Sequence, residues 1–141
     1  MGISAAATLL LGAAPVAETG GPLEIEMTGL RSSKGVVRLC LIRDPADFPD
    51  CRDGKGALKR TLPAENPRIR LEGLPAGDYA IAVIHDANQN EKLDTMLGIP
   101  REGFGFSRNP AIRFGPPRYK DVRFTLGGDA QRQQVRIRYL L

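Results

Sequence analysis

The stretch Gly73-Leu-Pro-Ala-Gly-Asp-Tyr-Ala-Ile-Ala-Val-Ile84 joins a tight turn to the clearest strand of the chain. Pro75 and Gly77 stand at positions that favour a turn, because proline restricts φ and glycine accepts positive φ. The run from Tyr79 to Ile84 is apolar, which is typical of a strand in the centre of a sheet. This stretch therefore indicates a fold built from strands, with residues 78–84 at its centre.

Other segments continue the same pattern on both sides. The 16 glycines and 11 prolines interrupt the chain every few residues, which favours short strands joined by turns over helices. Residues 43–62 and 85–110 are predicted as long connections, with a helical turn near 55–62. We therefore predict one domain over residues 22–141, an all-β, antiparallel two-sheet sandwich of about seven strands, prealbumin- or immunoglobulin-like. The strands are predicted at 23–28, 36–42, 68–72, 78–84, 120–126 and 133–140.

Residues 1–17 resemble a signal peptide in composition. Ile3 to Val16 is small and apolar around Leu9-Leu-Leu11, and Ala14 and Ala17 offer small-residue cleavage sites. The first four residues carry no Lys or Arg. The positive charge of a signal-peptide n-region would then come from the terminal amine alone, or from residues that precede Met1 if translation starts at an earlier codon. The run is too short to span a membrane, which takes about 20 residues. We predict a periplasmic or secreted protein; the alternative is a disordered Ala-rich tail.

The two cysteines, Cys40 and Cys51, suit the same compartment. Cys40 lies in the predicted strand 36–42, and Cys51 lies in a loop rich in Pro, Asp and Gly. A bridge between them would fasten the loop to its strand, with about 3 kcal/mol of stabilisation in the chain-entropy model. Such bridges persist in oxidising compartments. The alternatives are two free thiols in a cytosolic protein, and a redox pair, which the spacing disfavours because it is not Cys-x-x-Cys.

The charge of the chain is mildly basic, with a formal net charge of +4 and a pI near 9.4. The arginines are dispersed, aromatic residues make up 6% of the chain, and there is no Trp. A nucleic-acid-binding protein concentrates its basic residues on one stripe with stacking aromatics. We therefore predict no nucleic-acid partner and a solvated basic surface, with weak attraction to anionic envelope polymers or lipid head groups as the alternative.

Short motifs spread over roughly residues 22–141 carry a family resemblance. They are Gly29-Leu-Arg-Ser32, Gly35-Val-Val-Arg-Leu-Cys-Leu41, Phe48-Pro-Asp-Cys51, Leu74-Pro-Ala-Gly-Asp-Tyr-Ala-Ile81, His85-Asp-Ala-Asn-Gln-Asn-Glu-Lys-Leu-Asp94, Gly98-Ile-Pro-Arg-Glu-Gly-Phe-Gly-Phe-Ser107 and Gly115-Pro-Pro117. The chain resembles the bacterial family DUF2141, a domain of unknown function. The resemblance implies an exported bacterial β-protein and no known reaction. The turn at 74–79 is more loosely similar to turns in prealbumin-like sandwiches, which supports only the fold.

The motif at 85–94 is the part of the chain that points most directly to a specific chemistry. It places four short oxygen-bearing side chains at offsets 0, 2, 4 and 8, directly after the central strand. Ca²⁺ binds about six to eight oxygen ligands, from carboxylates, amides, carbonyls and water. The pattern therefore predicts a Ca²⁺-type site. The candidate ligands are Asp86, Asn88, Asn90, the carbonyl of Lys92, and Asp94.

Two departures from an EF-hand loop weaken this site. Glu91 stands where glycine is usual, and Leu97 stands where a bidentate Glu is usual. Glu102 would have to fold back to complete the shell. We therefore expect weak affinity, near the millimolar range of extracellular modules. The alternative is an Asx-rich turn without metal, since Asn and Asp bond readily to their own backbone.

The residues around this motif offer a possible ligand surface but a poor catalytic centre. His85 and Asp86 are adjacent on a strand and so point to opposite faces. Ser107 lacks the Gly-x-Ser-x-Gly elbow of a nucleophile, and one imidazole is too few for a transition-metal site. We predict no catalytic residue. The possible ligand surface consists of His85, Glu102, Phe104 and Phe106, although the two phenylalanines are better explained as a private core of the long loop.

These observations favour a non-catalytic, exported β-sandwich module for binding or envelope structure, with a loop organised by Ca²⁺. Its partner would be a polysaccharide, a peptide or an envelope protein. A second alternative, a purely structural module, differs from this one only because its loop binds no metal ion. The alternative from another class is an envelope hydrolase, which requires that His85 converge with a second polar group, such as Glu102 or Asp121.

Overall fold

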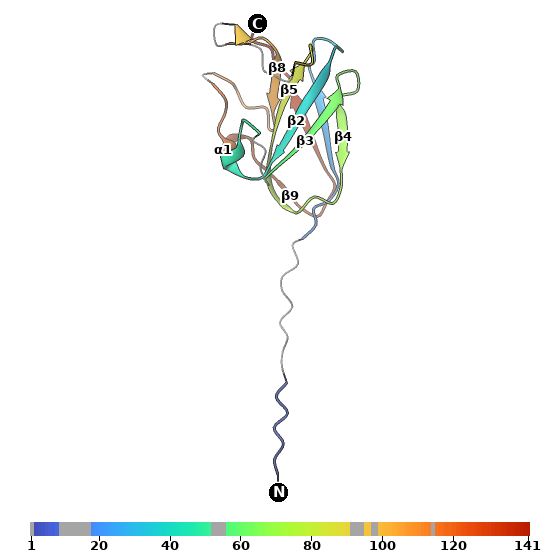
Figure 1. Cartoon of the computed structure of the whole chain (residues 1–141), viewed down its shortest axis with the longest axis vertical. Coiled ribbons are helices and arrows are strands. Elements are labelled where there is room, and N and C mark those ends of the chain that lie inside the picture. The colour runs from blue at the N-terminus through green and yellow to red at the C-terminus, as the bar shows by residue number, and fades with distance from the viewer. Residues whose placement is uncertain (1, 9–17, 52–55, 91–94, 97–98, 114) are drawn as a thin grey trace.

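The protein folds as two sheets packed face to face, which confirms the predicted sandwich (Figure 1). The computed structural model describes residues 2–8, 18–51, 56–90, 95–96, 99–113 and 115–141. The smaller sheet has the strand order β10-β1-β4, the larger sheet has the order β3-β2-β5-β8 with β9 pairing on β5, and β6 pairs with β7. The strands are β1 (Leu23–Thr28), β2 (Val36–Ile42), β3 (Ala57–Pro63), β4 (Arg68–Leu71), β5 (Gly77–Asp86), β6 (Thr95–Met96), β7 (Ile99–Pro100), β8 (Gly103–Phe106), β9 (Phe124–Leu126) and β10 (Gln131–Arg136); the helical turns are η1 (Pro45–Asp47) and α1 (Tyr119–Val122).

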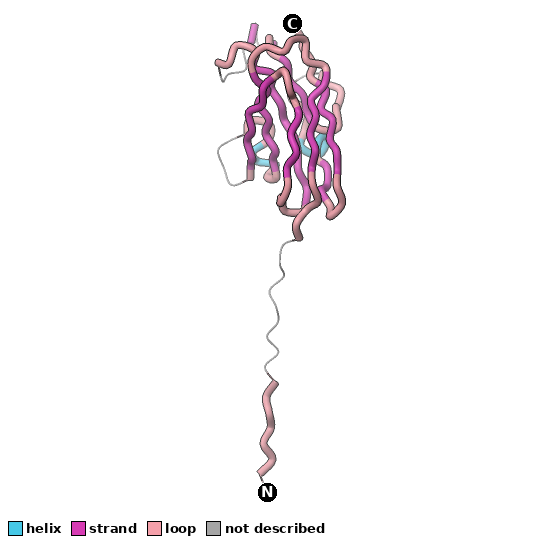
Figure 2. Tube along the Cα trace, turned by 90° about the vertical axis from the view of Figure 1, so that its right-hand side faces the viewer, coloured by secondary structure: helices cyan, strands magenta, loops and turns pink. Residues whose placement is uncertain are grey.

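The core lies between the sheets and is built by alternation along the strands. In β1, the side chains of Leu23, Ile25 and Met27 are buried while the residues between them are half-exposed. In β5, Tyr79, Ile81, Val83 and His85 are buried on the inner face, while Ala80 and Asp86 on the other face are buried as well. Each large apolar side chain buried here contributes about 1.5–3 kcal/mol. Figure 2 shows the strands of the two layers from the side.

One pairing departs from the antiparallel pattern, because β1 and β10 are parallel, with Leu23 opposite Gln131 and Thr28 opposite Arg136. Residues 127–130 cross from the end of β9 to the start of β1, where Gly21 N bonds to Gly127 O at 2.8 Å and Gln131 N bonds to Pro22 O at 2.9 Å. Both strands therefore leave the same end of the sandwich in the same direction.

Four strands, β3, β6, β7 and β8, lie in segments predicted as connections, and one predicted strand begins as a helix. β3 occupies the segment where a helical turn was predicted; it is half-exposed without alternation and is held by its full pairing with β2. β8 lies inside the predicted loop 85–110, where two glycines lower the strand propensity. Residues 119–122 form α1, so the strand predicted at 120–126 is reduced to β9.

The glycines of β8 allow the C-terminal segment to cross directly against this strand. A Cβ at Gly103 would lie 2.5 Å from Ile137 Cγ2 and 2.5 Å from Tyr139 Cε1, and one at Gly105 would lie 2.8 Å from Val135 Cγ1. Phe104 and Arg138 exchange two backbone hydrogen bonds, of 3.0 and 2.8 Å. The alternation Gly-Phe-Gly-Phe thus turns its glycines toward the core and its aromatic rings outward.

The outer face of the larger sheet is covered by the loop after β2. The predicted disulfide Cys40–Cys51 is present, with a Cα–Cα distance of 6.0 Å, and ties this loop to the middle of β2. Phe48 of the loop packs against Phe106 and Tyr119, with ring centroids 5.7 and 6.0 Å apart. A second, smaller apolar layer therefore lies outside the main core.

The N-terminal segment stands apart from the sandwich. Residues 2–8 are exposed, have no secondary structure and extend away from the body (Figure 1), while most of the predicted signal segment, at 9–17, lies outside the described residues. The body begins at Glu18, whose carbonyl accepts a hydrogen bond of 2.8 Å from Ala76 N. Among the described residues, no helix is long and apolar enough to cross a bilayer.

We predict that Gly103→Ala lowers the stability of the domain by about 1–3 kcal/mol, because the added methyl group would overlap Ile137 and Tyr139. Thermal unfolding should show a midpoint several degrees lower. Gly127→Ala is the matched control, since no atom lies within 4 Å of its Cβ position. Equal midpoints for the two variants would contradict the crossing described here.

Candidate functional site

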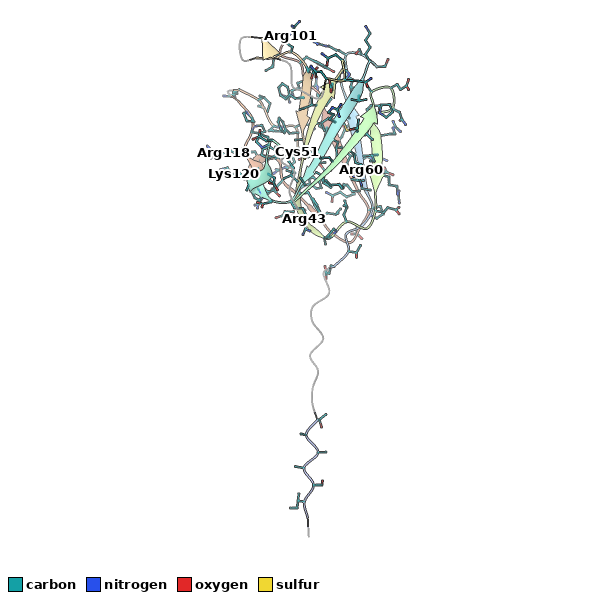
Figure 3. The ribbon with its side chains drawn as sticks, viewed as in Figure 1. Arg43, Cys51, Arg60, Arg101, Arg118 and Lys120 are labelled. Carbon is teal, nitrogen blue, oxygen red and sulfur yellow. A yellow bond between two sulfur atoms is a disulfide. The ribbon has the colours of Figure 1, made fainter. Side chains whose placement is uncertain are left out.

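The residues singled out from the sequence lie mostly at the end of the sandwich where β5 ends and β2 begins. His85 pairs with Gly103 of β8, and Asp86 pairs with Val36 of β2. The turn before β2 and the last residues of the chain reach the same end, as the bonds of Lys34 and Tyr139 to His85 show. Figure 3 labels Arg101 at this end.

His85 is buried, with 1% of its surface exposed, and both ring nitrogens are occupied. Nε2 lies 2.8 Å from the carbonyl oxygen of Lys34, and Nδ1 lies 2.7 Å from the hydroxyl of Tyr139. A carbonyl only accepts, so Nε2 carries the hydrogen and donates it. In that tautomer Nδ1 is the acceptor, and the Tyr139 hydroxyl donates to it.

Tyr139 links His85 to the turn at Arg31. Its hydroxyl oxygen accepts a hydrogen bond of 3.1 Å from Arg31 N, and the Arg31 guanidinium lies 4.3 Å from the ring centroid. The same guanidinium donates to the carbonyls of Leu141 and Arg101, at 2.7 and 3.1 Å. Burial raises the pKa of Tyr139, while the backbone N–H and the charge of Arg31 act in the opposite direction. The hydroxyl therefore stays protonated at neutral pH and remains a donor.

The described contacts of His85 are structural, and Asp121, one of the two partners considered for a hydrolase, lies far from it. Its two ring nitrogens are held by Tyr139 and Lys34, so neither is presented to a substrate. Asp121 belongs to α1, just before β9, and β9 pairs with Tyr79. Tyr79 lies six residues before His85 on β5, about 20 Å along an extended strand. His85 acts as an anchor between the turn at 31–35 and the C-terminal segment.

Asp86 points to the opposite face from His85, as predicted, and its carboxylate is buried. Oδ2 accepts a hydrogen bond of 2.8 Å from Arg38 Nε, which forms an ion pair, and Oδ1 accepts one of 3.1 Å from Asn90 N. Removing one partner of a fully buried ion pair typically costs about 3–5 kcal/mol; the cost is smaller here, because the Arg38 side chain is 31% exposed. Asp86 therefore has a clear structural role at the end of β5.

The described part of the acidic loop forms an Asx-rich turn. Asn90 N also donates to Asn88 Oδ1 at 3.3 Å, and Gln89, with φ of 55°, donates its N–H to the carbonyl of Asp86 at 3.3 Å. Lys92 and Asp94, the other two predicted ligands, lie outside the described residues. Within residues 18–51, 56–90 and the later described segments, no three His, Cys, Asp or Glu side chains gather in a metal-binding group.

The remaining candidates of the possible ligand surface are mostly covered. Glu102 and Phe104 are 7% and 9% exposed, and Phe106 is half-buried beneath Phe48. The rings of Phe104 and Phe106 lie 6.2 Å apart. These contacts favour the prediction of a private core over an exposed aromatic platform.

Ser107 is fully buried and holds β5 and α1 together. Its hydroxyl accepts a hydrogen bond of 3.0 Å from Ile81 N and donates one of 2.5 Å to the carbonyl of Val122. The hydroxyl group is thus used in structure, in agreement with the missing nucleophile elbow.

Sequence reasoning missed Arg38, Arg31 and Tyr139 as members of this region. Arg38 carried a usable signal, because it is the single charged residue in the apolar run Val36–Ile42 and so calls for a partner on the strand. The role of Tyr139 has no local signal, since it contacts a histidine 54 residues away.

Comparison with known families gives one match. The family model described as "Uncharacterized protein conserved in bacteria (DUF2141)" matches residues 25–134. No curated protein matches the chain, and no solved structure matches it.

We predict that Tyr139→Phe destabilises the domain by about 1–3 kcal/mol, because it leaves the buried Nδ1 of His85 and the N–H of Arg31 without their partner. Chemical denaturation of the two proteins measures the difference. Tyr119→Phe is the control, since its hydroxyl donates to the carbonyl of Arg43 at an exposed position. If both variants lost the same free energy, His85 would not depend on Tyr139.

Proposed function

We propose, on the premise that this chain belongs to the DUF2141 family of bacterial proteins, that it is an exported, non-catalytic β-sandwich module of the cell envelope. The observation that carries this proposal is the use of its reactive side chains inside the fold. His85, Asp86 and Ser107 each bond to backbone or side-chain groups of the protein. Side chains held in this way stabilise a scaffold and are not presented to a substrate.

Export is supported by two independent features. The disulfide Cys40–Cys51 is of the kind that persists in the periplasm or outside the cell. The apolar N-terminal segment precedes Glu18, the first residue that bonds to the sandwich. Cleavage after Ala14 or Ala17 would leave the sandwich complete.

The partner we propose is an envelope polysaccharide, peptide or protein. The outer face of the smaller sheet supports a polar contact, because Arg70 and Arg132 flank Glu24 across three strands at 3.2 Å each. Arg68 and Glu26 form a second cross-strand pair at 3.5 Å. The result is a surface that bears many donors and acceptors.

We further propose that Ca²⁺ is the ion of the loop at 86–94, bound weakly. The support is local: Asp86 Oδ1 and Asn88 Oδ1 accept hydrogen bonds from the same N–H of Asn90, so the two oxygens lie close together on the inside of the turn. The ion pair with Arg38 competes for the same carboxylate, which agrees with a low affinity.

Export is tested by expressing residues 1–141 in a bacterium and measuring the mass of the protein in each cell fraction by mass spectrometry. We expect a periplasmic or secreted protein that begins at Pro15 or Glu18, with Cys40 and Cys51 oxidised. Leu10→Arg, which places a charge at the centre of the apolar run, should keep the chain unprocessed. An uncleaved, reduced protein in the cytoplasm would exclude export.

Calcium binding is tested by thermal unfolding of the mature protein in EDTA and in about 10 mM Ca²⁺, roughly ten times a millimolar dissociation constant. We expect a stabilisation of about 1.4 kcal/mol, a shift of a few degrees. Asp94→Asn should remove the shift and leave the midpoint in EDTA unchanged.

Asp86→Asn separates the structural from the metal role in the same experiment. It should lower the midpoint in EDTA as well, because it breaks the ion pair with Arg38. The absence of a Ca²⁺ shift in the unmodified protein would reduce the loop to an Asx-rich turn.

A further inference from the structure

Acidic residues are absent from two segments of the chain, so its net positive charge is unevenly distributed. Residues 103–120 and 130–141 together carry seven Lys or Arg side chains and no Asp or Glu. All other residues together carry 13 Lys or Arg and 16 Asp or Glu, so their net charge is negative. The whole excess of +4 therefore originates in two segments that are separate in sequence.

The fold places these two segments side by side. Phe104 and Arg138 exchange backbone hydrogen bonds where the C-terminal segment crosses β8. Further along, the side-chain amide of Asn109 donates to Gln134 O at 3.0 Å and accepts from Arg136 N at 2.8 Å. The amide thus bonds to the backbone of β10 at two positions, as the backbone of a neighbouring strand does. Segment 107–113 is thereby fixed along β10.

Four arginines belong to these two segments here, and we name them, together with the shallow concavity between the segments, the cationic margin. Arg108 and Arg113 come from the segment after β8, and Arg136 and Arg138 come from β10 and its extension. The concavity between the segments is lined by Phe104, Phe106, Pro110, Ile112, Arg136 and Arg138. Ala111 is exposed, and Pro110 and Ile112 are half-exposed.

The neighbouring basic residues on α1 are less effective. Figure 3 shows Arg118 and Lys120 together at the side of the sandwich. Tyr119 between them packs on Phe48, in the loop that also carries Asp44 and Asp47. These carboxylates partly offset the positive charge there.

We propose that the cationic margin attaches the protein to a membrane surface by binding the phosphate groups of anionic phospholipids. Guanidinium groups bind phosphate oxygens with two parallel hydrogen bonds, and cationic side chains gain affinity from the surface potential of an anionic leaflet. The apolar residues 110–112 lie between Arg108 and Arg113, where they suit the boundary between headgroups and acyl chains. The proposal deepens the envelope function above and rests on it for the location of the protein.

The test is co-sedimentation of mature protein, residues 18–141, with vesicles of phosphatidylcholine alone or mixed with phosphatidylglycerol. The leader is omitted because its apolar run would itself enter lipid. We expect binding only to the mixed vesicles, and weaker binding as salt is raised. Each arginine near an anionic leaflet raises the partition coefficient of a protein onto the membrane about fivefold. Arg108→Gln with Arg113→Gln should therefore lower the partition coefficient onto the mixed vesicles about 25-fold.

Matched variants separate the margin from the overall charge. Arg136→Gln with Arg138→Gln should reproduce the loss from the opposite segment. Lys59→Gln with Arg60→Gln should retain most of the binding, because both side chains are exposed on β3, at the opposite edge of the larger sheet from β8. Equal losses in all three double variants would overturn the proposal in favour of net charge. Binding to soluble polyphosphate but not to mixed vesicles would also overturn it. Either failure leaves the export test intact, because that test reads only cleavage and location.

Discussion

The close contact of residues 135–139 with β8 is the constraint on which the rest of the structure depends. It joins the two sheets at one margin through the paired hydrogen bonds of Phe104 and Arg138. It requires that Gly103 and Gly105 have no side chain, since a Cβ at either would overlap the crossing segment. The same contact brings Tyr139 beneath His85 and sets Arg136 and Arg138 beside the segment after β8.

The polar residues at the end of β5 illustrate how a suggestive motif can serve the fold. Burying a polar group costs free energy unless it finds a hydrogen-bond partner inside the protein. His85 and Asp86 are both buried, and both find partners on distant segments: Lys34 and Tyr139 for the imidazole, and Arg38 for the carboxylate. Each bond fixes one loop to the sandwich. The residue types that suggest catalysis in the sequence therefore hold the connections between strands.

The parts of this structure that the sequence predicts are those with a local cause. β1 and β2 follow from alternation and an apolar run, and the bridge Cys40–Cys51 follows from a loop that leaves β2 and returns to it. β3 was missed because an edge strand depends on its partner more than on its own pattern. No short sequence pattern in either strand predicts the parallel pairing of β1 with β10.

The site divides in the same way. The opposite orientation of His85 and Asp86 and the covered rings of Phe104 and Phe106 follow from strand periodicity and from apolar burial. The partners of the two polar residues do not, because Arg38 lies 48 residues from Asp86 and Tyr139 lies 54 from His85.

The smaller sheet depends most on pairing between distant parts of the chain. In this sheet β1 lies between β4 and β10, with Leu23 opposite Gln131. This sheet cannot close until residues 131–136 have been synthesised, and such long-range pairing is slow to form. One edge of β1 therefore stays unpaired while the roughly 100 residues between it and β10 are added.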